Sequence, residues 1–102
     1  MKNYDKLVRD LIPEIIEGNN QKCTFRILSD EEFLFYAEKK LDEELQEYHE
    51  DRTLEELIDI IEIIEAIAKA KGVSWDEMEK MRIKKQTERG GFSKKKFLHC
   101  VE

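Results

Sequence analysis

The chain is poor in residues that break helices or cross-link small domains. Its 102 residues include one proline, four glycines and two cysteines. With 41% charged residues, so few breakers favour long helices over a β-sandwich or barrel. The thiols, Cys23 and Cys100, lie near opposite ends without CxxC or Cys/His spacing. We therefore expect two reduced structural cysteines rather than a zinc site or a disulfide framework.

Long apolar runs and a net positive charge are also absent. No run reaches the roughly 18 apolar residues of a membrane span, and residues 1–17 lack the apolar stretch of a signal peptide. The net charge of −6 argues against a binder of nucleic-acid polymers, which usually carries a basic face. We expect a single domain over residues 1–102, located in the cytoplasm, with no membrane partner and no nucleic-acid polymer as partner.

Three helix starts share one pattern, a hydroxyl at the N-cap position followed three residues later by an acid. The hydroxyls are those of Ser29, Thr53 and Ser74. They predict helices that begin near residues 30, 54 and 75 and end near residues 50, 72 and 89. The connection over residues 51–52 is short, so the first two helices should form an antiparallel hairpin.

The segments outside these helices carry weaker signals. Residues 5–17 have apolar side chains at helical spacing, but Pro13 interrupts them, so we expect two short helical pieces and disfavour helix at Ile12. Segments 22–28 and 96–101 contain β-favourable residues that could pair as a small antiparallel ribbon. The predicted fold class is mainly α, a helical bundle to which such a ribbon could be added.

Four acids fall in two pairs three residues apart, one pair on each of the first two predicted helices. They are Glu44 with Glu47 and Glu56 with Asp59. At about 100° per residue, Glu44 lies on the apolar stripe of its helix and Glu56 on the isoleucine stripe of the next, whereas Glu43 projects to the polar side. A core-facing carboxylate must be protonated, paired or bound to a cation. Four carboxylates close together favour a bound cation over the other two arrangements.

The position of the two pairs suits phosphate chemistry. Both lie next to the hairpin connection, where they can face each other and form an acidic pocket. Mg²⁺ takes oxygen ligands and is usually held by a few carboxylates together with phosphate oxygens. Such an ion neutralises phosphate and lowers the pKa of a bound water that can attack phosphorus. The pattern therefore indicates hydrolysis of a phosphoanhydride.

At these residues the chain resembles a known family. Glu43-Glu44-x-x-Glu47 followed by Glu56-x-x-Asp59 is similar to the EExxE…ExxD signature of the all-α nucleoside triphosphate pyrophosphohydrolases, the MazG superfamily. The opening segment 6–16 and the late segment 89–92 resemble a small single-domain branch related to phosphoribosyl-ATP pyrophosphohydrolase. The resemblance covers nearly the whole chain. Only eight residues separate Glu47 from Glu56, fewer than in many members, which a shorter hairpin loop would explain.

The resemblance implies a reaction and a set of residues. The reaction is Mg²⁺-dependent cleavage between the α and β phosphates of a nucleotide, which releases the monophosphate and pyrophosphate. Mn²⁺ is a candidate substitute for Mg²⁺, and cleaning of the nucleotide pool is a candidate role. The implied catalytic and metal-ligating residues are Glu44, Glu47, Glu56 and Asp59. A triphosphate also needs cationic side chains, and the candidates for substrate binding are Lys6, Arg9, Lys85 and Arg89.

Plainer interpretations remain open. Glu56 could be only the capping acid of Thr53, Glu47 only a surface charge, and most lysines and arginines are simply solvated. The runner-up function is a non-catalytic helical oligomer or adaptor whose acidic pocket binds metal or a basic partner. The sequence does not identify the base or sugar of a nucleotide substrate, nor whether that substrate is a normal or a damaged nucleotide.

The second predicted helix is apolar on almost every side. Ile58 and Ile61 point away from the face that Glu56 shares with the isoleucine stripe. A helix that is apolar nearly all round is normally buried nearly all round, and three principal helices in one short chain can cover only part of it. We expect a homodimer with a four-helix core, or a higher homo-oligomer, and the second chain is a candidate to complete the nucleotide pocket.

Overall fold

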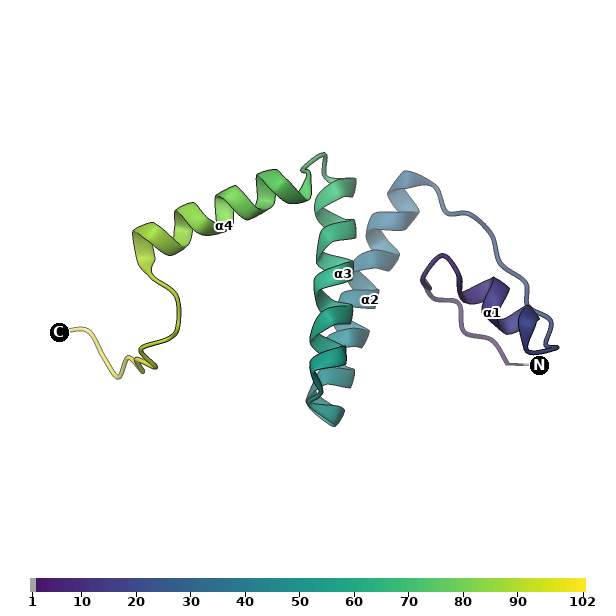
Figure 1. Cartoon of the computed structure of the whole chain (residues 1–102), viewed down its shortest axis with the longest axis horizontal. Coiled ribbons are helices and arrows are strands. Elements are labelled where there is room, and N and C mark those ends of the chain that lie inside the picture. Colours follow the sequence, from purple (N-terminus) through teal and green to yellow (C-terminus); the bar gives the residue numbers. More distant parts are fainter. Residues whose placement is uncertain (1) are drawn as a thin grey trace.

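A computed structural model describes residues 2–102 as four helices: α1 (Ile12–Gly18), α2 (Asp30–Asp51), α3 (Leu54–Ala70) and α4 (Trp75–Arg89) (Figure 1). Met1, the first residue of the predicted single domain, lies outside the described residues. The mainly α fold class is confirmed, and α2, α3 and α4 begin where the three hydroxyls predict. Among residues 2–102, none of the helices has both the length and the apolarity needed to span a membrane.

Side-chain caps fix the helix starts. The Ser29 hydroxyl accepts a hydrogen bond from the Glu32 amide, and the Glu32 carboxylate accepts one from the Ser29 amide, which satisfies two amides that have no partner inside the helix. Helix α2 ends at Arg52, whose φ of 55° is left-handed and whose amide donates to the Tyr48 carbonyl. This tight reversal turns the chain directly into α3, so the predicted antiparallel hairpin forms.

The prediction of two helical pieces in residues 5–17 is wrong. One helix forms there, and Ile12, where helix was disfavoured, is its first residue. Pro13 therefore lies in the first turn, where an amide has no intrahelical acceptor and its absence costs no hydrogen bond. The Ile12 amide donates instead to the Arg9 carbonyl. Residues 2–9 are irregular and lead into a turn at 10–11; we call residues 2–11 the N-terminal arm.

The predicted β ribbon does not form either. Segments 22–28 and 96–101 are irregular, and no strand occurs within residues 2–102. The reason is the arrangement of the helices, because the α2–α3 hairpin stands between the two segments and keeps them at opposite ends of the molecule (Figure 1). Residues with high β propensity form no strand when no partner is within reach.

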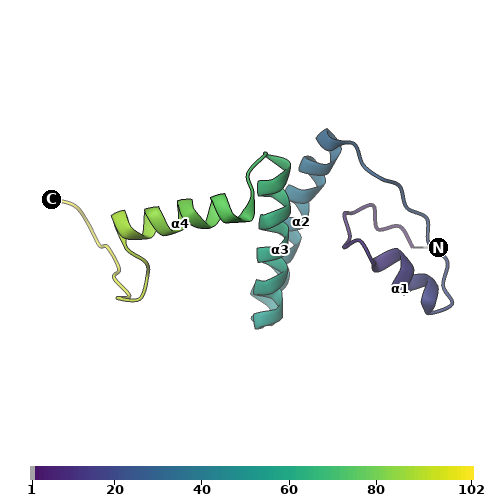
Figure 2. The ribbon, with the colours of Figure 1, turned by 45° about the horizontal axis from the view of Figure 1, so that its top comes forward.

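The molecule is extended. Helices α2 and α3 pack side by side, α4 contacts α3 alone among the helices of the described chain, and α1 contacts none of them. Two views agree that α4 leaves the hairpin on the side opposite α1 (Figures 1 and 2). The Cα radius of gyration is 17.9 Å, whereas a compact chain of this length has about 13 Å. One chain therefore covers little of its own apolar surface.

The hydrophobic core is correspondingly small. Within residues 2–102 the buried apolar side chains are those of Ala37, Ile63 and Ala68. Ile58 and Ile61 are 53% and 50% exposed, whereas the isoleucine stripe of α3, formed by Ile60, Ile63 and Ile67, is buried or half-buried. The predicted phase of α3 is therefore confirmed, and its second apolar face lacks a cover in the single chain.

Candidate metal and phosphate site

The predicted acids meet at the loop end of the hairpin. Glu44, in the second half of α2, and Glu56 and Asp59, in the first turns of α3, each offer a carboxylate oxygen within 4.8 Å of the others. Glu47 lies outside this group of three, but its charge raises the pKa of both Glu44 and Glu56, so its carboxylate is a close neighbour. We call the four residues together the acid cluster.

Glu44 has the surroundings that its helical phase predicts. The residue is 6% exposed, and it is the one buried charged residue of the described chain. Its Oε1 lies 3.3 Å from Lys40 Nζ, while its Oε2 has no hydrogen-bond partner among residues 2–102. Burial raises the pKa of Glu44, and the contact with Lys40 opposes the rise. A buried carboxylate oxygen without a partner is costly, and a bound cation would remove that cost.

The carboxylate of Glu56 takes no part in capping its helix. Its backbone amide donates to Thr53 Oγ1 at 3.3 Å, but its carboxylate does not return to the Thr53 amide as that of Glu32 does at Ser29. Its Oε2 is buried and unpartnered in the described chain. Burial and then the neighbouring Glu47 charge raise the pKa of Glu56 to about 7. The Glu56 carboxylate therefore does not complete a capping box with Thr53.

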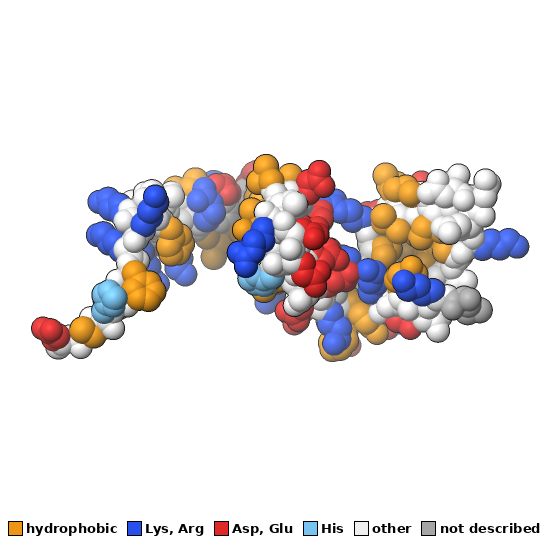
Figure 3. All heavy atoms as spheres, turned by 90° about the horizontal axis from the view of Figure 1, so that it is seen from below, with side chains coloured by type: hydrophobic (Ala, Val, Ile, Leu, Met, Phe, Trp, Pro, Cys, Tyr) orange, Lys and Arg blue, Asp and Glu red, His pale blue; other side chains and the backbone are white. Residues whose placement is uncertain are grey.

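Two of the predicted phosphate-binding residues lie at the acid cluster, and both come from the N-terminal arm. Arg9 Nη2 is 2.7 Å from Asp59 Oδ1, and Lys6 Nζ is 2.7 Å from Glu43 Oε1. A view along the hairpin shows acidic side chains on the side that faces the N-terminal part of the chain, with lysine and arginine side chains between the two (Figure 3). The arm thus brings positive charge to an otherwise acidic face.

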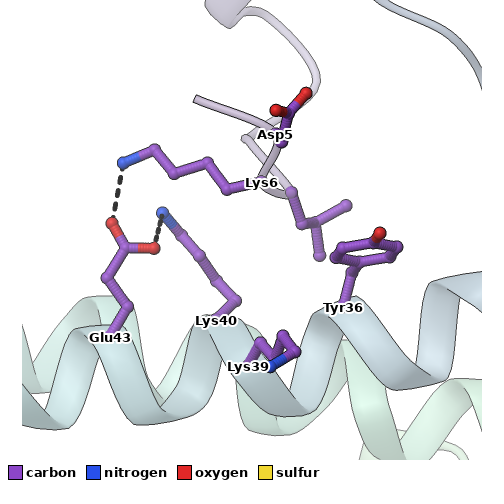
Figure 4. Close-up of a pocket in the computed structure, with 7 residues that line it drawn as sticks. Asp5, Lys6, Tyr36, Lys39, Lys40 and Glu43 are labelled. Carbon is purple, nitrogen blue, oxygen red and sulfur yellow. Dashed lines mark hydrogen bonds and ion pairs between the residues drawn. The ribbon is translucent and has the colours of Figure 1, made fainter. Parts of the chain in front are cut away.

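Glu43 lies on the polar side of α2, as predicted, but it is paired with lysines. It is half-buried, and Lys6 of the arm and Lys40 of α2 point at its two carboxylate oxygens (Figure 4). A cavity of about 60 Å³ opens beside them, with Leu7 and Tyr36 in its lining. The position on the polar side of α2 was predicted correctly; the lysines that cover it were not.

Lys85 and Arg89 are not part of this arrangement. Both are exposed on α4, which points away from the hairpin on the side opposite the arm (Figure 2). Lys40, by contrast, contacts both Glu43 and Glu44 and was missed as a site residue. Its spacing of three and four residues from these acids was the available signal, because such pairs meet on a helix surface.

The donor set fits a hard divalent cation. The three converging ligands are all carboxylate oxygens, which suit Mg²⁺ or Mn²⁺ better than the softer metals that prefer sulfur or imidazole. Two buried oxygens that lack partners in the described chain belong to this same group. The chain's own cations, Arg9 and Lys40, each contact a different acid of the group and leave these two oxygens unpaired.

Comparison with known proteins does not assign this chain to a family. No family model, curated protein or solved structure matches this chain. The function must be argued from the residues and their geometry.

Proposed function

We propose that this chain is a Mg²⁺-dependent nucleoside triphosphate pyrophosphohydrolase of the MazG-like type, which converts a nucleotide to its monophosphate and pyrophosphate. The observation that carries the proposal is the Glu44 carboxylate, which is buried inside a group of three converging acids and has one oxygen without a partner in residues 2–102. These three acids all belong to the EExxE…ExxD pattern of the sequence, so the geometry brings together three of the four acids that the motif selects.

Each residue has a role in this proposal. Glu44, Glu56 and Asp59 hold Mg²⁺, and Glu47, adjacent to Glu56, completes the acidic ligand set. Bound Mg²⁺ neutralises phosphate oxygens and lowers the pKa of a water molecule. Arg9, which already reaches Asp59, binds phosphate oxygens, because a guanidinium matches them with two parallel N–H groups.

Turnover of a nucleotide panel tests the activity. We expect release of pyrophosphate and a monophosphate from at least one normal, damaged or phosphoribosyl nucleotide in the presence of Mg²⁺ or Mn²⁺, and none after chelation. A protein that binds Mn²⁺ yet releases pyrophosphate from no member of the panel would instead be the non-catalytic adaptor of the runner-up interpretation. Because the panel varies base, sugar and damage, the same assay identifies the substrate class.

We further propose that the working unit is a homodimer or higher homo-oligomer. The extended shape and the exposed Ile58 and Ile61 support this, because a second copy packed on α3 would bury apolar surface that one chain leaves in water. Lys85 and Arg89 lie far from the acid cluster of their own chain, so a role for them in phosphate binding requires the cluster of the partner.

Mixing two inactive variants tests the shared site. If Arg89 acts across the interface, a heterodimer of Glu44→Gln with Arg89→Gln contains one intact site, made of the acids of one chain and the arginine of the other. Random reassortment should then restore about a quarter of the wild-type activity, since half of the dimers are mixed and each has one working site. No recovery on mixing would show that Arg89 does not act across the interface.

A further inference from the structure

Arg9 is attached to the acid cluster by a single side-chain contact across a long stretch of sequence. Its Nη2 donates to Asp59 Oδ1 at 2.7 Å, and the two residues are 50 positions apart. Asp59 is one of the three acids whose oxygens converge. A charge-assisted hydrogen bond of this length engages that carboxylate oxygen directly. Arg9 thus serves as a counter-ion of the acid cluster.

The contact is open to exchange. The side chains of Arg9 and Asp59 are 51% and 36% exposed, and an ion pair with that much water around it contributes little net free energy. The arm has a separate anchor three residues earlier, where Lys6 pairs with Glu43 and Leu7 lines the small cavity together with Tyr36 (Figure 4). Arg9 could therefore leave Asp59 while Lys6 keeps the arm beside the hairpin.

A divalent cation and the guanidinium compete for this acid. Mg²⁺ binds a carboxylate oxygen at roughly 2.0–2.1 Å, and an arginine held at the same carboxylate would place two cations side by side. Within residues 2–102, Glu44 and Glu56 each have an unpaired buried oxygen, whereas Oδ1 of Asp59 is paired with Arg9. Of the three converging acids, Asp59 is the one that is in contact with the arm, so a cation bound there would be placed next to the Arg9 charge.

We propose that Arg9 guards the acid cluster: it pairs with Asp59 in the metal-free protein, gives up that pair when a divalent cation binds, and is thereby freed to bind an anionic phosphate group of the substrate. This inference rests on the proposed function, because it requires the acid cluster to bind metal. It adds a second role for the arm, which holds the cluster together before metal arrives and carries a phosphate ligand afterwards.

Calorimetric titration with Mn²⁺ tests whether Arg9 competes with a divalent cation. Arg9→Gln should bind Mn²⁺ about two- to fivefold more tightly than the wild type, the factor that corresponds to an exposed ion pair. Arg9→Lys keeps the charge and should stay close to the wild type. The matched control is Arg26→Gln, which loses the same charge but pairs with Glu32 at the start of α2, so its Mn²⁺ affinity should not change.

Hydrogen exchange supplies a readout that does not depend on affinity. On saturation with Mn²⁺, amides of residues 8–12 should exchange faster because Arg9 no longer holds this end of the arm at Asp59, whereas amides around the acid cluster in α2 and α3 should exchange more slowly. Unchanged or weaker Mn²⁺ binding by Arg9→Gln, or slower exchange in the arm, would refute the proposed role of Arg9 without contradicting the metal site. Absence of Mn²⁺ binding in the wild type and in every variant would refute both the metal site and the proposed role of Arg9.

Discussion

Two adjacent carboxylates of α2 should respond very differently to the same substitution. Glu44→Gln keeps the shape of the side chain and removes the charge from a residue that is 6% exposed. One Glu44 oxygen in the three-acid group has no partner within residues 2–102. Glu43→Gln makes the same chemical change at a half-buried residue whose two oxygens already face Lys6 and Lys40. The pair is therefore a matched test of the site.

The expected magnitudes are far apart. Loss of a group that only orients a metal ligand costs about 10- to 100-fold in metal affinity or activity, so loss of a ligand such as Glu44 should cost at least about 100-fold, or about 2.7 kcal/mol. Glu43 takes part in ion pairs near the surface, which are worth about 0.2–1 kcal/mol. Its substitution should change activity by no more than about fivefold.

The assay is pyrophosphate release at saturating Mg²⁺ with the best nucleotide of the panel, accompanied by circular dichroism to verify the helical fold. Both variants should retain the helix content of the wild type, because neither substitution leaves a cavity. Equal damage from Glu43→Gln and Glu44→Gln would refute the reasoning from helical phase, and full activity of Glu44→Gln would remove the acid cluster as the metal site.

Three further outcomes follow from the same structure. Mg²⁺ should raise the melting temperature, since it binds the folded cluster and not the unfolded chain; an unchanged melting temperature at millimolar Mg²⁺ would contradict the site. Because the pKa of Glu56 is raised to about 7 from 4.5, the folded state binds the extra proton, so metal-free stability should fall as pH rises from about 4.5 to 7. Glu56→Gln should lack this part of the pH dependence and be more stable than the wild type above pH 7, as thermal unfolding without metal would reveal. Ile58→Glu and Ile61→Glu should shift the protein to monomers in light scattering, whereas a wild type that is already monomeric at micromolar concentration would exclude the dimer.

Local chemistry made much of this structure predictable from sequence. The hydroxyl and acid pairs at Ser29, Thr53 and Ser74 mark the starts of α2, α3 and α4 correctly, because a cap satisfies amides within one turn of the chain. Helical phase also identified Glu44 as the inward acid and Ile58 and Ile61 as the outward face. Each of these predictions depends on residues within a few positions of one another.

Features that depend on distant residues were missed. The pairs of Arg9 with Asp59 and of Lys6 with Glu43 join residues 50 and 37 positions apart, and no periodicity relates such positions. The direction of α4 after its turn is a tertiary feature as well, and it decides that Lys85 stands apart from the acids of its own chain. The β ribbon was wrongly expected for the same reason, since β propensity does not reveal whether two segments can meet.

The acid cluster and the thin core are physically connected. Glu44 occupies a position on the apolar stripe of α2 where a leucine or isoleucine would add to a core whose buried apolar members, within residues 2–102, are Ala37, Ile63 and Ala68. A buried carboxylate weakens a fold unless a cation compensates it, and the uncovered face of α3 weakens it further. Bound metal and a second subunit would each favour the folded state by mass action. The stability of this chain should therefore depend on both metal and protein concentration. For variants that lose metal binding or dimerisation, stability and activity should be measured together.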